Sequence, residues 1–401
     1  MPAHLATLPG TPPHWSAPPA PPALAQLLRR ADVLFNGPRP WDIQVHHKRL
    51  YARLYAGWSL GAGEAYVDGD WDCEQLDELF TRLLRADLDR QPPGLGRLRL
   101  WAEGLRHRLF NLQSPQRAFQ VGQQHYDVGN DVFQAMLDSR LVYSCAHWAR
   151  ADNLEDAQAD KLALICHKLA LQPGMRLLDI GCGWGALARY AAEHHGVQVL
   201  GVTVSREQLA LAREHNAGWP VTLQLADYRS LRGQFDRVVS VGMFEHVGPK
   251  NHSAYFSTVQ RLLSPEGLFL LHSIGLDRST AATDPWIDRY IFPNGRLPSA
   301  SALSRALEGR FVIEDWHNFG PDYDRTLMCW WARFDAAWPR LAPRYGPRFY
   351  RLWRYYLLSC AGLFRARQGQ LWQLVLAHRQ RSAVYRSVRL SAGAGGAFSG
   401  Q

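Results

Sequence analysis

The stretch Leu177–Gly185, LLDIGCGWG, carries the strongest structural signal in the chain. Its apolar residues Leu177, Leu178 and Ile180 suit a buried strand of a parallel sheet. Three alternating glycines follow, which permit a tight turn and let backbone N–H groups approach a ligand closely. The next residues, ALARYAAEHH, have helical spacing. The stretch therefore predicts a strand, a glycine loop and a helix, the nucleotide-binding unit of a doubly wound α/β sheet.

The loop also indicates the kind of ligand. Dinucleotide-binding loops prefer G-x-G-x-x-G and place a helix start against a pyrophosphate. Here the spacing is G-x-G-x-G, no basic residue lies in the loop, and Asp179 precedes the first glycine. A carboxylate at this point suits a cationic or amine-bearing ligand. The loop resembles the first motif of S-adenosylmethionine-dependent methyltransferases, and the alternative is an ordinary glycine turn.

Composition limits the class of protein. The 401 residues are 47% hydrophobic and 20% charged, as in globular proteins, and suit two domains or one extended domain. The formal charge of +9 points to nucleic acid or anionic lipid, although a basic surface without a partner is common. The six cysteines form no C-x-x-C pair, so we expect no metal and a reducing compartment. We recognise no signal peptide or transmembrane stretch, so any membrane contact is expected to be peripheral.

Four segments are predicted: a disordered proline-rich tail over 1–25, a first folded unit over 26–115, a catalytic unit over 116–390 and a flexible tail over 391–401. In the catalytic unit, strands alternate with helices from RLLDI to GLFLLHSIG, and EGRFVIEDWHNFG is expected to close the sheet. From Trp330 to about His378 the pattern predicts helix. The expected fold class is α/β, a doubly wound Rossmann-like sheet with a smaller N-terminal domain and a helical C-terminal extension.

Ligands of open α/β sheets bind at the carboxyl ends of the strands, and this rule selects a set of residues. After the second strand, where an acid commonly binds ribose, the chain has Thr203, with Gln208 close behind it. A hydroxyl and an amide can replace the hydrogen bonds of that acid. Tyr228 and Arg229 follow the third strand and are well placed for an adenine.

Three candidate proton-handling groups follow the next two strands. Glu245 and His246 come after the fourth strand and His272 lies at the end of the fifth. An acid and an imidazole at adjacent strand ends can hold a shared ligand or move a proton. For His246 a packing role is favoured, and His272 taken alone suits a hydrogen-bonded core histidine. Upstream, Cys145 has no neighbour in sequence that obviously lowers its pKa, which argues against a nucleophile.

Together the motifs resemble those of the cyclopropane-fatty-acyl-phospholipid synthase family. In chain order they are HYDVGND, YSCAHW, LLDIGCGWG, GVTVS, VSVGMFEHVGPKN, LLHSIG, DPWIDRYIFPNG, EDWHNFGPDYDRTL and CAGLFRARQGQLWQ. The resemblance extends back into FNGPRPWD and LGAGEAYVDGDWDC and covers about residues 30–380. Thr203 in place of an acid is itself a feature of this family, and the clearest difference is the long proline-rich N-terminal tail.

The resemblance implies a reaction. The methyl group of S-adenosylmethionine is transferred to a cis double bond of an acyl chain on a membrane phospholipid. The carbocation that forms then loses a proton from the added methyl group, and a cyclopropane ring closes. Water would trap this cation, whereas aromatic faces stabilise it without attacking it, so the 15 Trp, 15 Tyr and 16 Phe have a plausible use.

The resemblance also implies the site residues. The expected cofactor contacts are Tyr143, Ser144, Asp179, Gly181, Gly183, Gly185, Thr203, Gln208, Tyr228 and Arg229. A bound bicarbonate is expected to take the proton, held by Cys145 and Ile274 through their backbone and by the side chains of Glu245, His272 and Tyr323. Cys360 corresponds to a cysteine discussed as catalytic in the family. A place in the pocket wall is favoured for it because the mechanism needs no covalent step.

The expected partners are a phospholipid membrane surface and a second copy of the chain, because the family's N-terminal unit aids membrane contact and dimer formation. We expect no nucleic acid partner and a place in the cytoplasm, at the inner membrane. The basic, aromatic segment Tyr345–Tyr356 suits contact with anionic headgroups. An ordinary helix with a solvated basic face explains it equally well.

Three alternatives remain open at this stage. The first is an acyl-chain methyltransferase whose product is branched or carries a methylene group; ring closure is favoured because every expected bicarbonate ligand is present. The second is a non-catalytic lipid-binding protein, against which Glu245, His272 and Tyr323 argue. The third is a nucleic-acid methyltransferase, for which the common Asn/Asp-Pro-Pro-aromatic motif is missing.

Overall fold

The structure, a computed structural model, describes residues 19–90 and 129–389. The tail expected over 1–25 lies largely outside these residues, but its last part is helical, which corrects the expectation there. Helix α1 (Pro22–Arg29) starts with proline, which suits a first position because the first N–H groups of a helix have no partner within it. The tail predicted over 391–401 and the boundary predicted near 115 lie outside the described residues.

A seven-stranded sheet forms the centre of the fold, which confirms the predicted α/β class. Its strands are β3 (Arg176–Ile180), β4 (Gln198–Thr203), β5 (Val221–Leu225), β6 (Phe235–Val241), β7 (Leu263–Leu276), β8 (Val312–Asn318) and β9 (Gly369–Ala377). They lie in the order β5-β4-β3-β6-β7-β9-β8. The strands from β3 to β7 are parallel, and β9 runs antiparallel to both neighbours. The strand order reverses between β3 and β6, where such sheets have their ligand crevice.

Strand β9 corrects the sequence prediction, which extended helix to about His378. Helix α14 ends at Arg365, and the run GQLWQLVLA is inserted as a strand between β7 and β8. Periodicity does not separate a short buried strand from a buried helix when the run is almost wholly apolar. The partners that settle the matter, β7 and β8, come from distant parts of the sequence. Strand β8 lies at the edge and closes the sheet as predicted.

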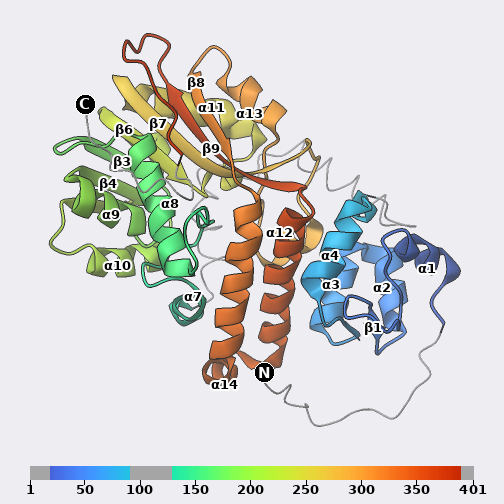
Figure 1. Cartoon of the computed structure of the whole chain (residues 1–401). Coiled ribbons are helices and arrows are strands. Elements are labelled where there is room, and N and C mark those ends of the chain that lie inside the picture. The colour runs from blue at the N-terminus through green and yellow to red at the C-terminus, as the bar shows by residue number, and fades with distance from the viewer. Residues whose placement is uncertain (1–18, 91–128, 390–401) are drawn as a thin grey trace.

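Helices cover both faces of the sheet, as Figure 1 shows. On one face lie α8 (Leu154–Lys168), α9 (Ala186–His195) and α10 (Arg206–His215), and on the other lie α11 (His252–Leu262) and α13 (Ala300–Leu307). Each face has its own apolar core. Because both faces are buried, the parallel strands are nearly continuous in apolar residues, as the sequence of β3 indicated.

A third core joins the N-terminal unit to helices from the C-terminal half. Its elements are α1, β1 (Gln44–Val45), α2 (Arg49–Gly57), α3 (Ser59–Val67), β2 (Trp71–Asp72), α4 (Leu76–Arg85), α7 (Asn130–Met136), α12 (Pro285–Tyr290) and α14 (Pro321–Arg365). Helix α14 folds back on itself at Gly346, whose φ of 70° is in the left-handed region. Hydrogen bonds from Arg365 to Asp324 and from Tyr350 to Asp335 join its two arms.

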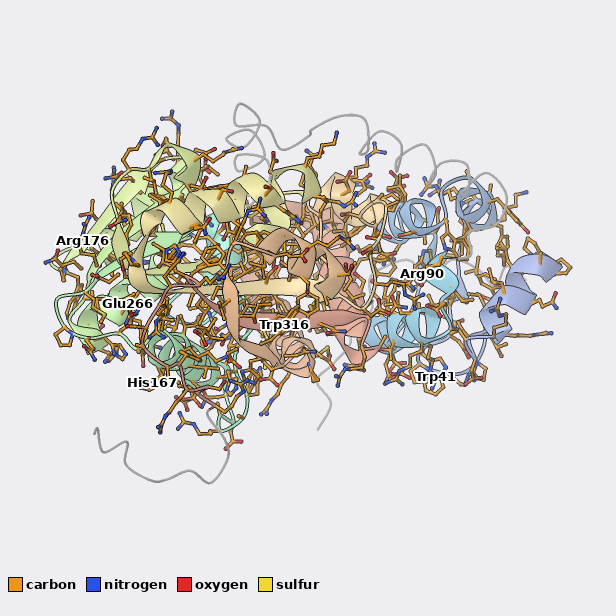
Figure 2. The ribbon with its side chains drawn as sticks, turned by 90° about the horizontal axis from the view of Figure 1, so that it is seen from above. Trp41, Arg90, His167, Arg176, Glu266 and Trp316 are labelled. Atoms are coloured by element: carbon orange, nitrogen blue, oxygen red, sulfur yellow. The ribbon has the colours of Figure 1, made fainter. Side chains whose placement is uncertain are left out.

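The N-terminal unit therefore packs against the arms of α14 rather than forming a core by itself. Figure 2 places Trp41 and Arg90 at one end of the molecule and Arg176 and Glu266 at the other. Arg176 starts β3 and Glu266 lies early in β7, so the amino ends of these strands point away from the N-terminal unit. The carboxyl ends, where ligands bind, consequently face it.

The segment Tyr345–Tyr356 is largely used inside the molecule, which favours the structural interpretation over headgroup contact. Arg351 donates to the carbonyls of Tyr66 and Trp71, and Arg354 donates to the hydroxyl of Tyr66. Buried aromatic side chains fill the same segment. These arginines fix the second arm of α14 to the N-terminal unit. Among the described residues, no helix combines the length and apolar composition needed to cross a membrane.

Candidate active site

The glycine loop after β3 has the geometry that the sequence indicated. Gly181, Gly183 and Gly185 have φ of 86°, 55° and 81°, which residues with side chains rarely adopt. A Cβ atom added at Gly181 would lie 2.8 Å from the Cβ of Met243, so the loop after β6 approaches this backbone closely. The amide of Gly181 donates to the carbonyl of Val202 and fixes the start of the loop against β4.

A cavity of about 230 Å³ lies over this loop, at the carboxyl ends of the parallel strands. The residues expected as cofactor contacts that line it are Tyr143, Ser144, Asp179, Gly181, Gly183, Thr203, Gln208, Tyr228 and Arg229. Gly185, also predicted as a cofactor contact, is not among the residues that line the cavity. It precedes the first residue of α9 and faces the Asn216 side chain, and its contact role stays a prediction. His246, for which packing was favoured, also lines the cavity.

Two buried ionisable groups, Asp179 and Lys161, are among the residues that line this cavity. Asp179 is 2% exposed, and burial raises the pKa of its carboxyl to about 7, opposed by the charge of Lys161. Lys161 is 1% exposed, burial lowers its pKa to about 8, and its Nζ donates to the Ser144 hydroxyl over 2.9 Å. Burying such charges is costly unless they are paired, so this site is prepared for a charged ligand.

Sequence analysis missed Lys161, although a signal for it was present. In α8, Leu154, Lys161, Ile165 and Lys168 lie on one buried face at helical spacing. A lysine on an apolar stripe is rarely buried without a partner. Both lysines of α8 fall on this stripe, and only the folded chain identifies what lies opposite each of them.

Polar groups from the next two strands complete the wall. The Thr203 hydroxyl lies 3.3 Å from the side-chain Oε1 of Gln208. The Ser205 hydroxyl caps α10 by accepting a hydrogen bond from the backbone N–H of Gln208. This cap holds Gln208 next to Thr203, in place of a ribose-binding acid. After β5, Tyr228 presents a half-buried aromatic ring whose pKa is raised by burial to about 12, and Arg229 is paired to Asp227.

Glu245 lies in the short helix after β6, at the next strand end. Its carboxylate Oε1 accepts from the backbone N–H of Ile274 over 2.7 Å, whereas Oε2 is buried and has no hydrogen-bond partner. Burial raises the pKa of Glu245 to about 7. The backbone of Ile274 was expected to contact the ligand. For its N–H group this expectation is corrected, because that group already donates to Glu245.

His272 lies on β7 with both ring nitrogens buried. Its Nδ1 is 3.2 Å from Nε2 of Gln373 on β9, and its Nε2 has no hydrogen-bond partner. Burial lowers the pKa of His272 well below its usual value, helped by the charges of Lys161 and Lys168, so the ring is neutral. The site thus contains one buried acceptor and one buried imidazole nitrogen with unused hydrogen-bonding capacity.

Tyr323 and Cys145 border the same region. Tyr323 lies in the first turn of α14, with its ring stacked on Phe364, and packs with Cys145 and Ile274 in one apolar cluster. Burial raises the pKa of the Tyr323 hydroxyl well above its usual value, and the nearby Cys145, Tyr143 and Glu245 add to this. Burial likewise raises the pKa of the Cys145 thiol, which argues against a thiolate nucleophile.

A second cavity, of about 210 Å³, lies between the N-terminal unit and the helices α12 and α14. Its wall is almost wholly apolar, contributed by residues such as Leu28, Leu54, Leu83 and Trp286, and it includes Cys360. The pKa of the Cys360 thiol is raised by burial to about 12, which agrees with the favoured role in a pocket wall.

One hydrogen bond links the surroundings of the two cavities. The hydroxyls of Tyr143 and Tyr356 lie 2.7 Å apart; Tyr143 lines the first cavity, and Tyr356 neighbours both Cys360 of the second cavity and Tyr323. The aromatic residues between the cavities come from α14 and from the segment before α8. Tyr323 therefore has a neighbour in each wall, Tyr143 in the first cavity and Cys360 in the second, and Glu245 lies near it as well.

The sheet order, the glycine loop and the buried carboxylate define the class of S-adenosylmethionine-dependent methyltransferases. The chain belongs to the mycolic acid cyclopropane synthetase family, whose model matches residues 113–374. It is 55% identical over 350 residues to the cyclopropane-fatty-acyl-phospholipid synthase of Escherichia coli K12, covering 87% of this chain and 91% of that protein.

Two further relatives extend the comparison. The tuberculostearic acid methyltransferase UfaA1 of Mycobacterium tuberculosis is 32% identical over 84% of both chains. The mycolic acid cyclopropane synthase CmaA1, solved in complex with SAH and CTAB, superimposes with a TM-score of 0.60 at 33% identity, covering 64% of this chain and 97% of that one. The predicted family and the predicted methyltransferase class are both confirmed.

Proposed function

We propose that this enzyme transfers the methyl group of S-adenosylmethionine to the cis double bond of an unsaturated phospholipid acyl chain and closes a cyclopropane ring. The alkene supplies the electron pair for the new bond to the methyl carbon, and S-adenosylhomocysteine leaves. The carbocation left on the neighbouring chain carbon then loses one proton of the added methyl group to a base, and the electrons of that C–H bond close the ring. The 55% identical synthase of Escherichia coli supports this substrate class.

One observation carries the proposal: Tyr323, which has Glu245 nearby, neighbours Tyr143 in the wall of the polar cavity and Cys360 in the wall of the apolar one. The polar cavity suits S-adenosylmethionine, because Asp179 can pair with its ammonium group and Thr203 with Gln208 can bind ribose hydroxyls. The apolar cavity suits an acyl chain. A methyl transfer to carbon needs the two substrates to meet in a dry site, since water would trap the cation.

Bicarbonate fits the unused hydrogen-bonding groups of Glu245, His272 and Tyr323. Its hydroxyl can donate to the unpartnered Oε2 of Glu245, and its oxygens can accept from Nε2–H of His272 and from the Tyr323 hydroxyl. Two neutral donors offset the repulsion between the bound anion and the Glu245 carboxylate. Burial raises the pKa of Glu245, so its carboxyl is partly protonated and the repulsion is smaller. When bound, bicarbonate supplies the base that removes the methyl proton.

We further propose that the enzyme works in the cytoplasm, bound peripherally to the membrane as a homodimer. The phospholipid substrate requires access to a bilayer, and all six cysteines are free thiols, as a reducing compartment favours. Arg340, exposed near the fold-back of α14, offers positive charge to anionic headgroups. Light scattering of the purified protein tests the dimer, and a monomer at all concentrations would contradict it.

The deciding experiment incubates the purified enzyme with methyl-labelled S-adenosylmethionine and vesicles of a monounsaturated phospholipid. We expect acyl chains heavier by one CH₂ group, with loss of olefinic proton signals and appearance of cyclopropane ring protons in the NMR spectrum. Turnover should rise with added bicarbonate. Unmodified lipid, together with a failure to bind S-adenosylmethionine, would overturn the proposal.

A second candidate function is methylation without ring closure. The relative named tuberculostearic acid methyltransferase, at 32% identity, favours it because the cation is shared and the proton lost decides the product. The same experiment separates the two candidates. Methylene or vinyl protons in the product, without ring protons, would select this second reaction.

A further inference from the structure

The neighbour of His272 on β9 is Gln373, which the sequence analysis did not single out. The two residues are directly opposite in the antiparallel register of β7 and β9, and their exposed fractions are 1% and 0%. Gln373 Nε2 lies 3.2 Å from His272 Nδ1. His317 lies opposite Gln373 on β8. Its Nδ1 is 3.1 Å from Nζ of Lys168, so the His317 ring is held by a residue of α8.

The direction of the Gln373–His272 hydrogen bond decides the tautomer of the imidazole. An amide N–H donates, so Nδ1 of a neutral histidine must be the acceptor and the proton must be on Nε2. In this orientation Oε1 has no partner, and Nε2 uses one of its two N–H donors. Turning the amide would leave its two N–H donors unpaired in a dry core instead, and orphaned donors are rarer than under-satisfied oxygens.

The consequence is at the other side of the ring. With its proton on Nε2, His272 presents a donor at the atom that has no partner in the protein. An N–H at this position attracts an anion, whereas a bare nitrogen lone pair repels it. The residues expected to hold the anion include the Glu245 carboxylate, so a donor is needed if an anionic base is to bind there.

We infer that Gln373 is a positioning residue that fixes His272 as the Nε2–H tautomer and thereby makes it a donor to the anionic base of the reaction. This inference rests on the proposed function for the identity of the anion, although the tautomer itself does not. Partners of this kind, which orient a histidine through its second nitrogen, typically contribute about ten- to a hundred-fold to the activity of a site.

The test changes the donor into an acceptor. In Gln373→Glu, a carboxylate of the same shape takes the hydrogen bond from Nδ1–H, so His272 should carry its proton on Nδ1. We expect kcat to fall about ten- to a hundred-fold and the KM for bicarbonate to rise. The dissociation constant for S-adenosylmethionine should stay within about twofold of wild type, because the cofactor cavity is unchanged.

Gln370→Glu is the matched control on the same strand. The Gln370 oxygen accepts from Asn318 Nδ2 and Trp372 Nε1, and a carboxylate can accept from both. It adds the same charge to β9 without touching His272, so its kcat and bicarbonate response should match wild type. If Gln373→Glu does not fold, Gln373→Met removes the hydrogen bond without adding charge and should lower kcat in the same direction.

The tautomer is read directly by NMR of ¹⁵N-histidine-labelled full-length protein, with His272→Asn identifying the signal. A wild-type proton on Nε2 that moves to Nδ1 in Gln373→Glu supports the inference. A wild-type proton on Nδ1, or an unchanged kcat and bicarbonate KM in Gln373→Glu, overturns it. A wild-type enzyme that makes no cyclopropane refutes the proposed function separately, since the NMR experiment still measures which nitrogen Gln373 leaves protonated.

Discussion

The two cavities of this molecule are similar in size, about 230 and 210 Å³, and opposite in chemistry. The first is built by loops that follow successive parallel strands, and buried ionisable groups lie in its floor. The second is built by helices of the N-terminal unit together with α12 and α14, and its wall is almost wholly apolar. The first wall thus combines a buried acid with a buried lysine, whereas the second includes two acids, Asp89 and Asp284, in a mostly apolar lining.

The difference explains why the proton-handling groups lie where they do. Asp179 and Lys161 can be buried because they offset each other and because Lys161 donates to Ser144. The wall of the helical cavity includes Asp89 and Asp284 but is mostly apolar, and it consequently suits the apolar part of a substrate. Tyr323 neighbours a residue of each wall and has Glu245 nearby, so a boundary between the cavities lies at these two residues. The comparison predicts that changes at this boundary and in the two cavities affect different kinetic constants.

Substitution at the boundary should have the largest effect. Glu245→Gln keeps the hydrogen bond from the Ile274 amide through its amide oxygen but loses the carboxylate acceptor. We expect kcat to fall about 10²- to 10³-fold, as for the loss of a proton-transfer group, with little change in S-adenosylmethionine affinity. Steady-state kinetics and calorimetry measure the two effects. The control is Glu308→Gln, which changes an exposed side chain. An equal loss of kcat and of S-adenosylmethionine affinity in Glu245→Gln would show that Glu245 belongs to the cofactor site.

Substitution in the polar cavity should weaken the cofactor. Asp179→Asn removes the buried carboxylate, and we expect the dissociation constant for S-adenosylmethionine to rise about 10- to 100-fold, the value of a charged hydrogen bond. Its effect on kcat at saturating cofactor should be smaller than that of Glu245→Gln. Calorimetric titration measures the change, and an unaltered dissociation constant would remove Asp179 from the binding site.

The same carboxyl gives a pH signature. Because burial raises the pKa of Asp179 to about 7, roughly half of these carboxyls are protonated at pH 7. A bound cation favours the charged form and lowers the pKa, so binding should release a fraction of a proton near pH 7. The release should vanish well above pH 8, where Asp179 is already ionised. Calorimetry in two buffers of different protonation enthalpy measures it, and proton uptake on binding would contradict the assignment.

Filling the apolar cavity should affect the lipid alone. Leu83 lines it from α4, and Leu83→Trp is expected to raise the KM for unsaturated phospholipid about tenfold, with S-adenosylmethionine binding unchanged. Leu211→Trp, on α10 and outside this cavity, provides the matched control. Loss of cofactor affinity in Leu83→Trp would show that the two cavities are not independent.

The smallest effect is expected at the surface. Arg340 is exposed in α14, and Arg340→Gln should weaken binding to vesicles containing anionic lipid about fivefold, from roughly 1 kcal/mol per basic residue. Co-sedimentation at low salt measures this, with Arg379→Gln, an exposed arginine after β9, as the control. Equal effects of the two substitutions would point to general charge attraction instead of a docking surface at the fold-back of α14.

Much of the polar cavity could be predicted from sequence because its residues follow strands at short range. The LLDIGCGWG stretch encodes a strand, a turn with positive φ and a helix start within a few residues, and the chemistry of Asp179 and Thr203 follows from their places after β3 and β4. The motif order then indicated the family. Such local patterns depend on backbone conformation and side-chain periodicity, both of which a sequence displays directly.

The tertiary structure alone decided the features that depend on distant partners. The strand β9 exists because β7 and β8 accept it between them, Lys161 is a site residue because α8 turns it towards Ser144, and Gln373 faces His272 because of the antiparallel register. The apolar cavity likewise needs the N-terminal unit and α14 together. Sequence by itself determined the cofactor loop and the class of chemistry. Which side chains meet at the site was settled by tertiary packing, because those contacts join different elements, from Lys161 with Ser144, 17 positions apart, to Gln373 with His272, 101 positions apart.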